Sequence, residues 1–570
     1  MTSGPGVVRV GNASGFYGDR FEALTEMLTG GELDVLTGDY LAELTMLILG
    51  RDRMKDPARG YARTFLGQLE EGLGLALDRG VRIVANAGGL NPAGLAEAVR
   101  ELAGRLGLDA KVAHVEGDDL LGHGFPGALT ANAYLGCWGV AECLRAGADV
   151  VVTGRVTDAS LVVGPAAAHH GWGREDLDAL AGATVAGHVI ECGAQATGGN
   201  FAFFTELDDL DRPGFPIAEI AADGSAVVTK HAGTGGAVTV ETVTAQLLYE
   251  IAGPRYLGPD VTARFDTITL TQLGKDRVGI GGVRGEAPPE TAKVCVNTLD
   301  GFRNGMTFVL CGLDIEEKAA LVRRQLTAAV GAEGLHWTLA RTDHSDADTE
   351  EAASALLHAT IMTPEAGRAK AFSRAAVELA LASYPGAAFT SPPGDPTPVG
   401  VYRPEYVPQQ VVEQVAVLPS GERRPIAPPT AFGPTAFGPT AFGPTADEPP
   451  AERSGERPNG PTRRVPLGRV LGARSGDKGG DANLGVWVRD PAAYPWLIAE
   501  LTVDRLRELL PEARDLEITR YPLPNLGAVN FVLRGLLGRG VAASTRFDPQ
   551  AKSLGEWLRS RHADIPETLL

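Results

Sequence analysis

The chain has 570 residues, of which 44% are hydrophobic and 22% charged, so its composition is that of a folded globular protein with two or three domains. Its formal net charge of −19 argues against nucleic acid or an anionic membrane as a partner. The cysteines number five, which is odd, and include no C-x-x-C pair, so the sequence indicates neither a disulfide scaffold nor a cysteine zinc site. Neither a signal-peptide pattern nor a run of about 18 apolar residues occurs, so a cytoplasmic location is expected.

Short apolar runs in the first part of the chain are each followed by a loop rich in Gly, Asn, Asp or Thr. The runs are Val7–Val10, Leu33–Leu36, Val81–Ala85, Lys111–Val115 and Val150–Val152. Alternation of such runs with amphipathic helices predicts βαβ units, and therefore an α/β domain with a mostly parallel sheet. Ligands of parallel α/β sheets bind outside the carboxyl ends of the strands, so we expect the Gly-rich strand-end loops to form one small-molecule site.

The first strand-end loops offer candidates of two kinds. Backbone donors for an anion are predicted at Gly11, Asn12, Ser14, Gly15, Gly88 and Gly89, although a tight turn explains the first loop equally well. Asp39, with Glu43 one helical turn later, is a candidate acid or base, and a capping role for Asp39 is the alternative. Asn86 is expected to point into the site, because helix capping by Asn91 does not explain it.

The loops after the next two apolar segments carry the strongest candidates. Arg155 can hold a carboxylate or phosphate, with Thr157 beside it and Asp158 as a candidate base. The alternative is an internal Arg155–Asp158 ion pair that closes the turn. In the later loop, Glu191 is a candidate base, and Gln195 and Asn200 are candidate ligand contacts. Cys192 would be a nucleophile only if a base lowered its pKa; the alternative is a buried, inert thiol.

Two later loops complete the candidate site. Lys230 and His231 precede a Gly-rich turn and could bind an anion and move a proton, or could be a surface lysine and a structural histidine. Near the C-terminus, Arg474, Asp477 and Lys478 lie in a charged loop, Arg474–Asn483, that could cover the site or be solvated. We expect no metal, because the spacing of His, Asp and Glu in residues 114–123 matches no ligand pattern.

The same features define the domain organisation. Residues 1–418 are predicted to form the α/β core, with a possible sub-lobe from about Ile217, where strands alternate more and lie closer together. Residues 419–463 are rich in Pro and Gly and contain PTAFG three times from Pro429 to Gly443, which predicts a disordered linker. Residues 464–570 are predicted to form a small α+β domain.

Several long motifs resemble those of the AtuA family, named for acyclic terpene utilisation. They include NAGGLNP, VVTGRVTDASLVVGP, HVIECGAQATGGNF and TKHAGTGGAVTVETVTAQLLYEI in the core, and RSGDKGGDANLGV in the C-terminal domain. The resemblance implies a core domain followed by a small ferredoxin-like domain. It also implies a place in the degradation of citronellol, geraniol or similar compounds through coenzyme A thioesters, and it assigns no catalytic residue.

These observations favour a lyase or hydro-lyase that acts on a branched or carboxylated acyl-CoA or a related acid. Such a reaction needs an acid/base pair and an anion-binding pocket but no redox cofactor, and Asp39, Asp158, Glu191 and His231 are the candidate catalytic residues. The alternative is a non-catalytic ligand-binding or scaffold subunit that partners a CoA-dependent carboxylase or another pathway enzyme. A nucleotide-dependent ligase or kinase is disfavoured by the absence of a Walker A motif. The cofactor is left undefined, and a homo-oligomer is expected.

Overall fold

The computed structural model describes residues 6–433 and 460–570, which divide into two compact units. Unit 1 comprises Met1–Asn297, Tyr402–Val541 and Gln550–Leu570, and unit 2 comprises Thr298–Val401 and Ala542–Pro549. Most of the PTAFG repeat lies outside the described residues. No helix in the described part of the chain is long and apolar enough to cross a lipid bilayer.

The centre of unit 1 is a sheet of eleven strands with a parallel middle and antiparallel sides. The five parallel strands are, in spatial order, β1 (Val7–Asn12), β2 (Val35–Gly38), β3 (Arg82–Ala85), β6 (Val150–Thr153) and β4 (Val112–Glu116). Four further strands extend the sheet beyond β1 through antiparallel pairing, in the order β7 (Pro216–Ala221), β8 (Ala226–Lys230), β12 (Arg277–Gly281) and β11 (Thr269–Gly274). Two more extend it in the same way beyond β4, namely β19 (Val415–Val417) and then β20 (Arg423–Pro425). The predicted α/β class is confirmed.

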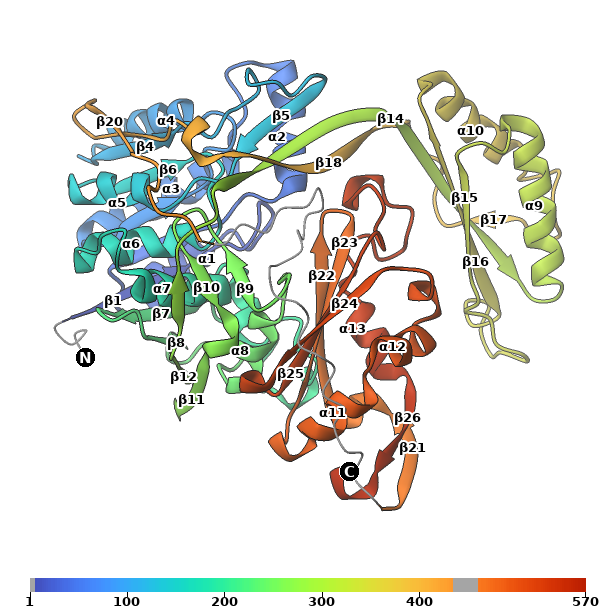
Figure 1. Ribbon diagram of the computed structural model, residues 1–570. Helices are drawn as coiled ribbons and strands as arrows, with labels where there is room; N and C mark the ends of the chain where they lie inside the picture. Colours follow the sequence, from blue (N-terminus) through green and yellow to red (C-terminus); the bar gives the residue numbers. More distant parts are fainter. Residues whose placement is uncertain (1–5, 434–459) are drawn as a thin grey trace. The chain divides into compact units, whose positions relative to one another are not determined.

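Helices cover both faces of this sheet (Figure 1). Successive residues of one strand enter different apolar clusters: Val151 packs with one cluster, whereas Val150 and Val152 pack with the other. The first cluster is covered by α5 (Trp138–Arg145), α6 (Ser160–His170) and α7 (Leu177–Ile190), and the second by α1 (Ala23–Gly30), α3 (Arg63–Arg79) and α4 (Pro92–Leu106). Burial on both faces explains why β6 is apolar without alternation.

The C-terminal part of unit 1 has its own antiparallel sheet and apolar core. Its strands are, in spatial order, β22 (Leu471–Lys478), β23 (Asp481–Val488), β25 (Ala528–Leu533) and β24 (Ile518–Leu523). The helices are α11 (Tyr494–Glu500), α12 (Val503–Leu509) and α13 (Leu554–Ser560), and β21 (Thr462–Pro466) pairs with β26 (His562–Pro566). The predicted loop Arg474–Asn483 is instead a hairpin, because β22 and β23 pair up to a two-residue Gly479–Gly480 turn.

Unit 2 has the order β-α-β-β-α-β. Its elements are β14 (Thr291–Cys311), α9 (Ile315–Val330), β15 (Leu335–Ala340), β16 (Ser354–Thr363), α10 (Ala366–Glu378) and β17 (Ala388–Phe389), with sheet order β15-β16-β14-β17. This connectivity is that of a split-βαβ, ferredoxin-like unit. β18 (Thr397–Pro408) also pairs with β14.

Two predicted boundaries differ from the observed ones. The compact sub-lobe begins at Thr298 rather than near Ile217, because β7 and β8 pair with β1 in the main sheet. The fold also continues past residue 418 into the predicted linker, where β20 pairs with β19. The rest of the predicted linker, at 434–459, lies outside the described residues.

Candidate functional site

A cavity of about 660 Å³ opens at the carboxyl ends of the parallel strands in unit 1. Its volume is in the range of small-molecule sites. Of the residues predicted for the site, Gly15, Asp39, Arg155, Thr157, Asp158, Glu191, Gln195, Asn200, Asp477 and Lys478 line it. The structure therefore brings loops from four separate segments of the core, together with the β22 end of the C-terminal sheet, to one cavity.

Arg155 is the buried cation of this cavity, with a side chain that is only 3% exposed. It follows β6, and its backbone N–H donates to Asp118 Oδ2 at 2.8 Å. Its Nη1 donates to the Leu41 carbonyl at 2.9 Å and to Asp158 Oδ1 at 2.7 Å, whereas its Nε has no hydrogen-bond partner among the described residues. The ion pair considered from the sequence is thus present, and it lies in the wall of the cavity.

Asp39 follows β2 and is held by the neighbouring strand end. Asn86, which follows β3, donates from Nδ2 to Asp39 Oδ1 at 2.6 Å and accepts from the Tyr40 N–H at 2.7 Å. Burial of the carboxyl group, together with the negative charge of Asp158, raises the pKa of Asp39 well above its usual range. Asn86 does not line the cavity itself; it orients an acid that does, and the surroundings of that acid oppose its ionisation.

Glu191 ends α7 and contacts His188 one turn earlier. His188 Nδ1 lies 3.0 Å from Glu191 Oε1, and both side chains are almost completely buried. Burial lowers the pKa of His188 to about 4, and burial with the charge of Asp158 raises the pKa of Glu191. His188 is therefore neutral at pH 7, so its contact with Glu191 is a hydrogen bond rather than an ion pair.

Glu43, at the start of α2 (Glu43–Lys55), is the acid of the cavity that stays ionised. Burial opposes ionisation, but the charges of Lys293 and Arg155 outweigh it and lower the pKa of Glu43 to about 2. Its Oε1 accepts a hydrogen bond from the Tyr134 hydroxyl at 2.7 Å and lies 3.6 Å from Lys293 Nζ. One carboxylate thus faces several cations.

The C-terminal sheet completes the cavity with Asp477 and Lys478 at the end of β22. Burial and the charge of Glu250 raise the pKa of Asp477 to about 8. The sheet is fixed to the core by buried amides: Asn483 on β23 donates to the Leu248 carbonyl at 2.8 Å and accepts from the Glu250 N–H at 2.7 Å. Arg474 does not line the cavity; it donates to Gln195, which does.

The charge of the lining depends on which of its acids are ionised. The lining has seven acids, Asp19, Asp39, Glu43, Asp158, Glu191, Glu250 and Asp477, and five bases, Arg155, Arg255, Lys293, Lys478 and Lys552. Asp39, Glu191 and Asp477 have raised pKa values, so three of the seven acids resist ionisation. This resistance makes the cavity more favourable to an anionic ligand than the number of acids suggests.

Other predicted residues lie outside the cavity and support the fold. His231 contacts the Met27 carbonyl at 2.9 Å, and Lys230 donates to the Thr234 carbonyl and pairs with Asp276 at 3.4 Å. Neither residue lines the cavity, because β7 separates β8 from β1, although β8 ends at the same edge of the sheet. Their contacts are those of the structural alternative.

The remaining predicted glycines and polar residues of the first and third loops are also structural. Asn12 donates to the Ile190 and Glu191 carbonyls, and Ser14 donates to the Asp39 carbonyl, so both tie strand ends together. A Cβ at Gly11, Gly88 or Gly89 would lie within 3 Å of neighbouring atoms, so these positions have no room for a side chain. None of the three lines the cavity.

The sequence raised two further chemical roles, a nucleophilic cysteine and a metal site. Burial and the charge of Glu191 raise the pKa of the Cys192 thiol well above its usual range, which disfavours a nucleophilic thiolate. Within residues 6–433 and 460–570, no three His, Cys, Asp or Glu side chains are arranged to hold a metal ion.

Sequence reasoning missed several lining residues, including Tyr134, Tyr249, Glu250, Lys293 and Lys552. Lys293 stands in the alternating run TAKVCV of β14, where a lysine is expected on a solvated strand face. Tyr249 and Glu250 follow α8 (Val240–Leu247) without a Gly-rich signal. Glu43 is the one further lining residue that the sequence indicated, because it follows Asp39 by one helical turn.

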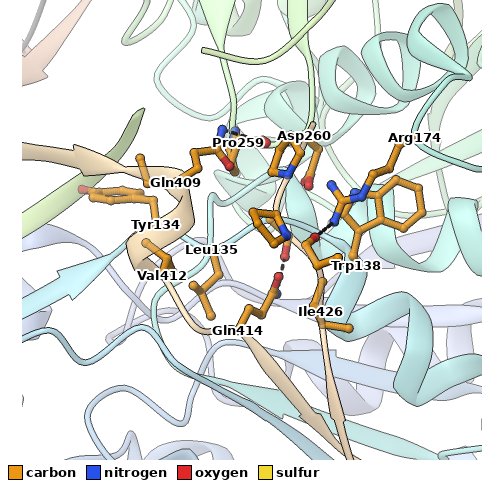
Figure 2. A pocket seen from close by; sticks show the side chains of 15 residues that line it. Tyr134, Leu135, Trp138, Arg174, Pro259, Asp260, Gln409, Val412, Gln414 and Ile426 are labelled. Atoms are coloured by element: carbon orange, nitrogen blue, oxygen red, sulfur yellow. Dashed lines mark hydrogen bonds between the residues drawn. The ribbon is translucent and has the colours of Figure 1, made fainter. Parts of the chain in front are cut away.

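A second, much smaller cavity of about 30 Å³ shares Tyr134 and Pro259 with the wall of the large one (Figure 2). Arg174 stacks over Trp138 with 5.1 Å to the ring centroid, and Asp260 accepts from the Cys137 N–H at 2.6 Å. It has room for one or two water molecules, so it is part of the supporting structure rather than a second ligand site.

Two protein-family models match the sequence of this chain. The model for the acyclic terpene utilisation family protein AtuA matches residues 8–418, and the model for the AtuA ferredoxin-like domain matches residues 465–564. The chain belongs to the AtuA family. Both matches support the resemblance seen in the motifs, and the family links the chain to acyclic terpene utilisation. No curated protein matches the chain.

Proposed function

We propose that this AtuA-family chain is a lyase or hydro-lyase that acts on a branched or carboxylated acyl-CoA, or a related acid, of acyclic terpene catabolism. The observation that carries the proposal is the convergence of Asp39, Asp158 and Glu191 around Arg155 in one cavity. Three acids around one buried cation supply proton donors and acceptors beside an anion-binding group, which is what elimination or addition at an acyl substrate needs.

Binding is assigned to Arg155 together with Lys478. The unpartnered Nε of Arg155 is a buried donor that a substrate carboxylate or phosphate would satisfy, and charge-assisted hydrogen bonds of this kind are among the strong ones. Lys478 lies at the end of β22 in the wall of the same cavity, so a longer anionic substrate would contact both domains of unit 1.

Proton transfer is assigned to the carboxyl groups. Asp158, paired with Arg155 at 2.7 Å, is the candidate base. Burial and the charge of Asp158 raise the pKa values of Asp39 and Glu191, so they are the candidate acids that would protonate a leaving hydroxyl group or the substrate carbon.

The test is exchange of the substrate hydroxyl in ¹⁸O-labelled water. Branched 3-hydroxyacyl-CoA and 2-enoyl-CoA thioesters are incubated with the purified chain, and ¹⁸O incorporation is followed by mass spectrometry. We expect incorporation with the wild-type chain and a loss of about 10²-fold or more in Asp158→Asn.

The matched control is Asp276→Asn, which alters an ion pair outside the cavity and should keep the wild-type rate. Wild-type exchange that Asp158→Asn leaves intact would remove Asp158 from the mechanism. Absence of exchange in the wild-type chain would favour the ligand-binding alternative.

A further inference from the structure

Lys293 is an amine of the cavity that the acid/base proposal does not use. It lies near the start of β14, where its carbonyl accepts from the Tyr134 N–H at 2.9 Å, so its position is fixed by strand pairing. Its Nζ lies 4.6 Å from the centroid of the Tyr134 ring and 5.7 Å from that of Tyr402. Among the described residues it has no hydrogen-bond acceptor; the nearest carboxylate oxygen, of Glu43, is 3.6 Å away.

Burial disfavours the ammonium form of Lys293, and two nearby cations add to this effect. Arg155 and Lys478 are close enough to lower its pKa, and Glu43 is the carboxylate that opposes them. Glu43 is itself shared by all three cations. Burial and the two cations outweigh Glu43, so the pKa of Lys293 falls below its usual range. Cys295, the other titratable group nearby on β14, has a pKa raised by burial to about 12 and stays neutral.

The other lysines of the cavity lack this combination. Lys552 donates to the Tyr249 hydroxyl at 2.7 Å. Burial disfavours the charge of Lys478, but Glu250 and Glu43 outweigh it and raise its pKa. Desolvation and an adjacent cation are the two conditions that make a lysine nucleophilic, and Lys293 meets both.

We propose that Lys293 is a nucleophile that forms a Schiff base with the aldehyde or ketone group of a carboxylate-bearing substrate. The lone pair of Nζ forms a bond to the carbonyl carbon, and the carbonyl oxygen takes a proton to give a carbinolamine. Loss of this oxygen as water leaves a protonated imine. The positive charge then stands beside ionised Glu43, while Arg155 holds the carboxylate of the substrate. This activity goes beyond the proposed acid/base reaction and is tested without it.

Borohydride trapping tests the proposal directly. The full chain is incubated with 4-oxopentanoate or glyoxylate, reduced, and mapped by peptide mass spectrometry. We expect a secondary amine at Lys293 that exceeds the adduct on exposed Lys275 by 10-fold or more. Lys293→Met should lose this adduct, whereas the matched surface variant Lys275→Met should keep it. Thermal unfolding of both variants checks that they are folded.

Direct titration of the amine gives a second readout that needs no carbonyl probe. Labelling with an amine-reactive reagent across a pH series is expected to give a midpoint for Lys293 below that of Lys275. The proposal is overturned if the two midpoints coincide, or if neither oxo acid gives an adduct at Lys293 above the level at Lys275. Neither outcome would affect the exchange test of Asp158, so the two proposals fail separately.

Discussion

Asp39 and Glu191 are carboxyl groups whose ionisation the fold opposes. Both are buried, and Asp158 adds its negative charge to the penalty for ionising either. A buried acid with a raised pKa is a marker of a functional site, because structure alone would favour an apolar or amide side chain there. This marker supports the proposal that Asp39 and Glu191 act on a ligand in the cavity.

Asp39→Asn is predicted to stabilise the chain increasingly as pH rises. The native pKa of Asp39 lies above the unfolded value of about 3.9, so the folded state binds more protons above that pH and stability falls as pH rises. Asparagine does not titrate and can still accept the bond from Asn86. The difference in Tm between variant and wild type should grow from pH 5 to pH 8 by roughly 2 °C or more, which corresponds to about 1 kcal/mol.

The control for this prediction is Asp223→Asn in an exposed turn. Hydrogen bonds from the Ser225 hydroxyl and N–H lower the pKa of Asp223, so its contribution is present at high pH and is lost as pH falls. Asp223→Asn should therefore show a negative Tm difference that stays constant from pH 5 to pH 8. A constant Tm difference for Asp39→Asn across the pH series would mean that Asp39 is not protonated in the native state.

At the scale of the element, the strand ends position the site through their backbone. The runs of β1, β2, β3 and β6 were predictable, because a buried parallel strand is continuously apolar and its end is marked by Gly, Asn or Asp. Site residues were predictable only where they directly follow such a strand, as Asp39 follows β2 and Arg155 follows β6. Lys293 was not, because it reaches the cavity from β14, whose alternating pattern gives no sign of a ligand site.

Gly154→Ala is predicted to disturb the site through packing rather than backbone strain. A Cβ at this position would lie 2.5 Å from both carboxyl oxygens of Asp118, and Asp118 Oδ2 accepts from the Arg155 N–H. The carboxyl group has to move, so Arg155 shifts with it. We expect a loss of about 1–3 kcal/mol in thermal or denaturant unfolding, together with slower ¹⁸O exchange.

The matched control for this loop is Gly104→Ala in α4. A Cβ there meets no atom within 4 Å, and alanine favours a helix over glycine, so stability should rise by about 0.5–1 kcal/mol. Equal and small effects of the two substitutions would show that the turn after β6 tolerates a side chain and that Asp118 does not fix Arg155.

At the scale of the whole molecule, the chain contains two units with separate apolar cores. Phe308 and Phe372 belong to the core of unit 2, whereas Phe531 belongs to the C-terminal core of unit 1. The boundary at Thr298 was not predictable, because β14 continues from unit 1 into unit 2 without a break in its alternating pattern. The short segment Ala542–Pro549 also belongs to unit 2, although its neighbours in the sequence belong to unit 1.

Separate cores predict separate unfolding transitions. Phe372→Ala removes a fully buried ring from unit 2 and should cost about 3–5 kcal/mol, which lowers the Tm of that unit by more than roughly 10 °C. Phe531→Ala is the matched substitution in unit 1, where the ring is equally buried. Differential scanning calorimetry should resolve two transitions, each lowered by one variant and little changed by the other. If both substitutions instead lower a single transition together, the units unfold as one cooperative body, and the stability of the cavity in unit 1 depends on the core of unit 2.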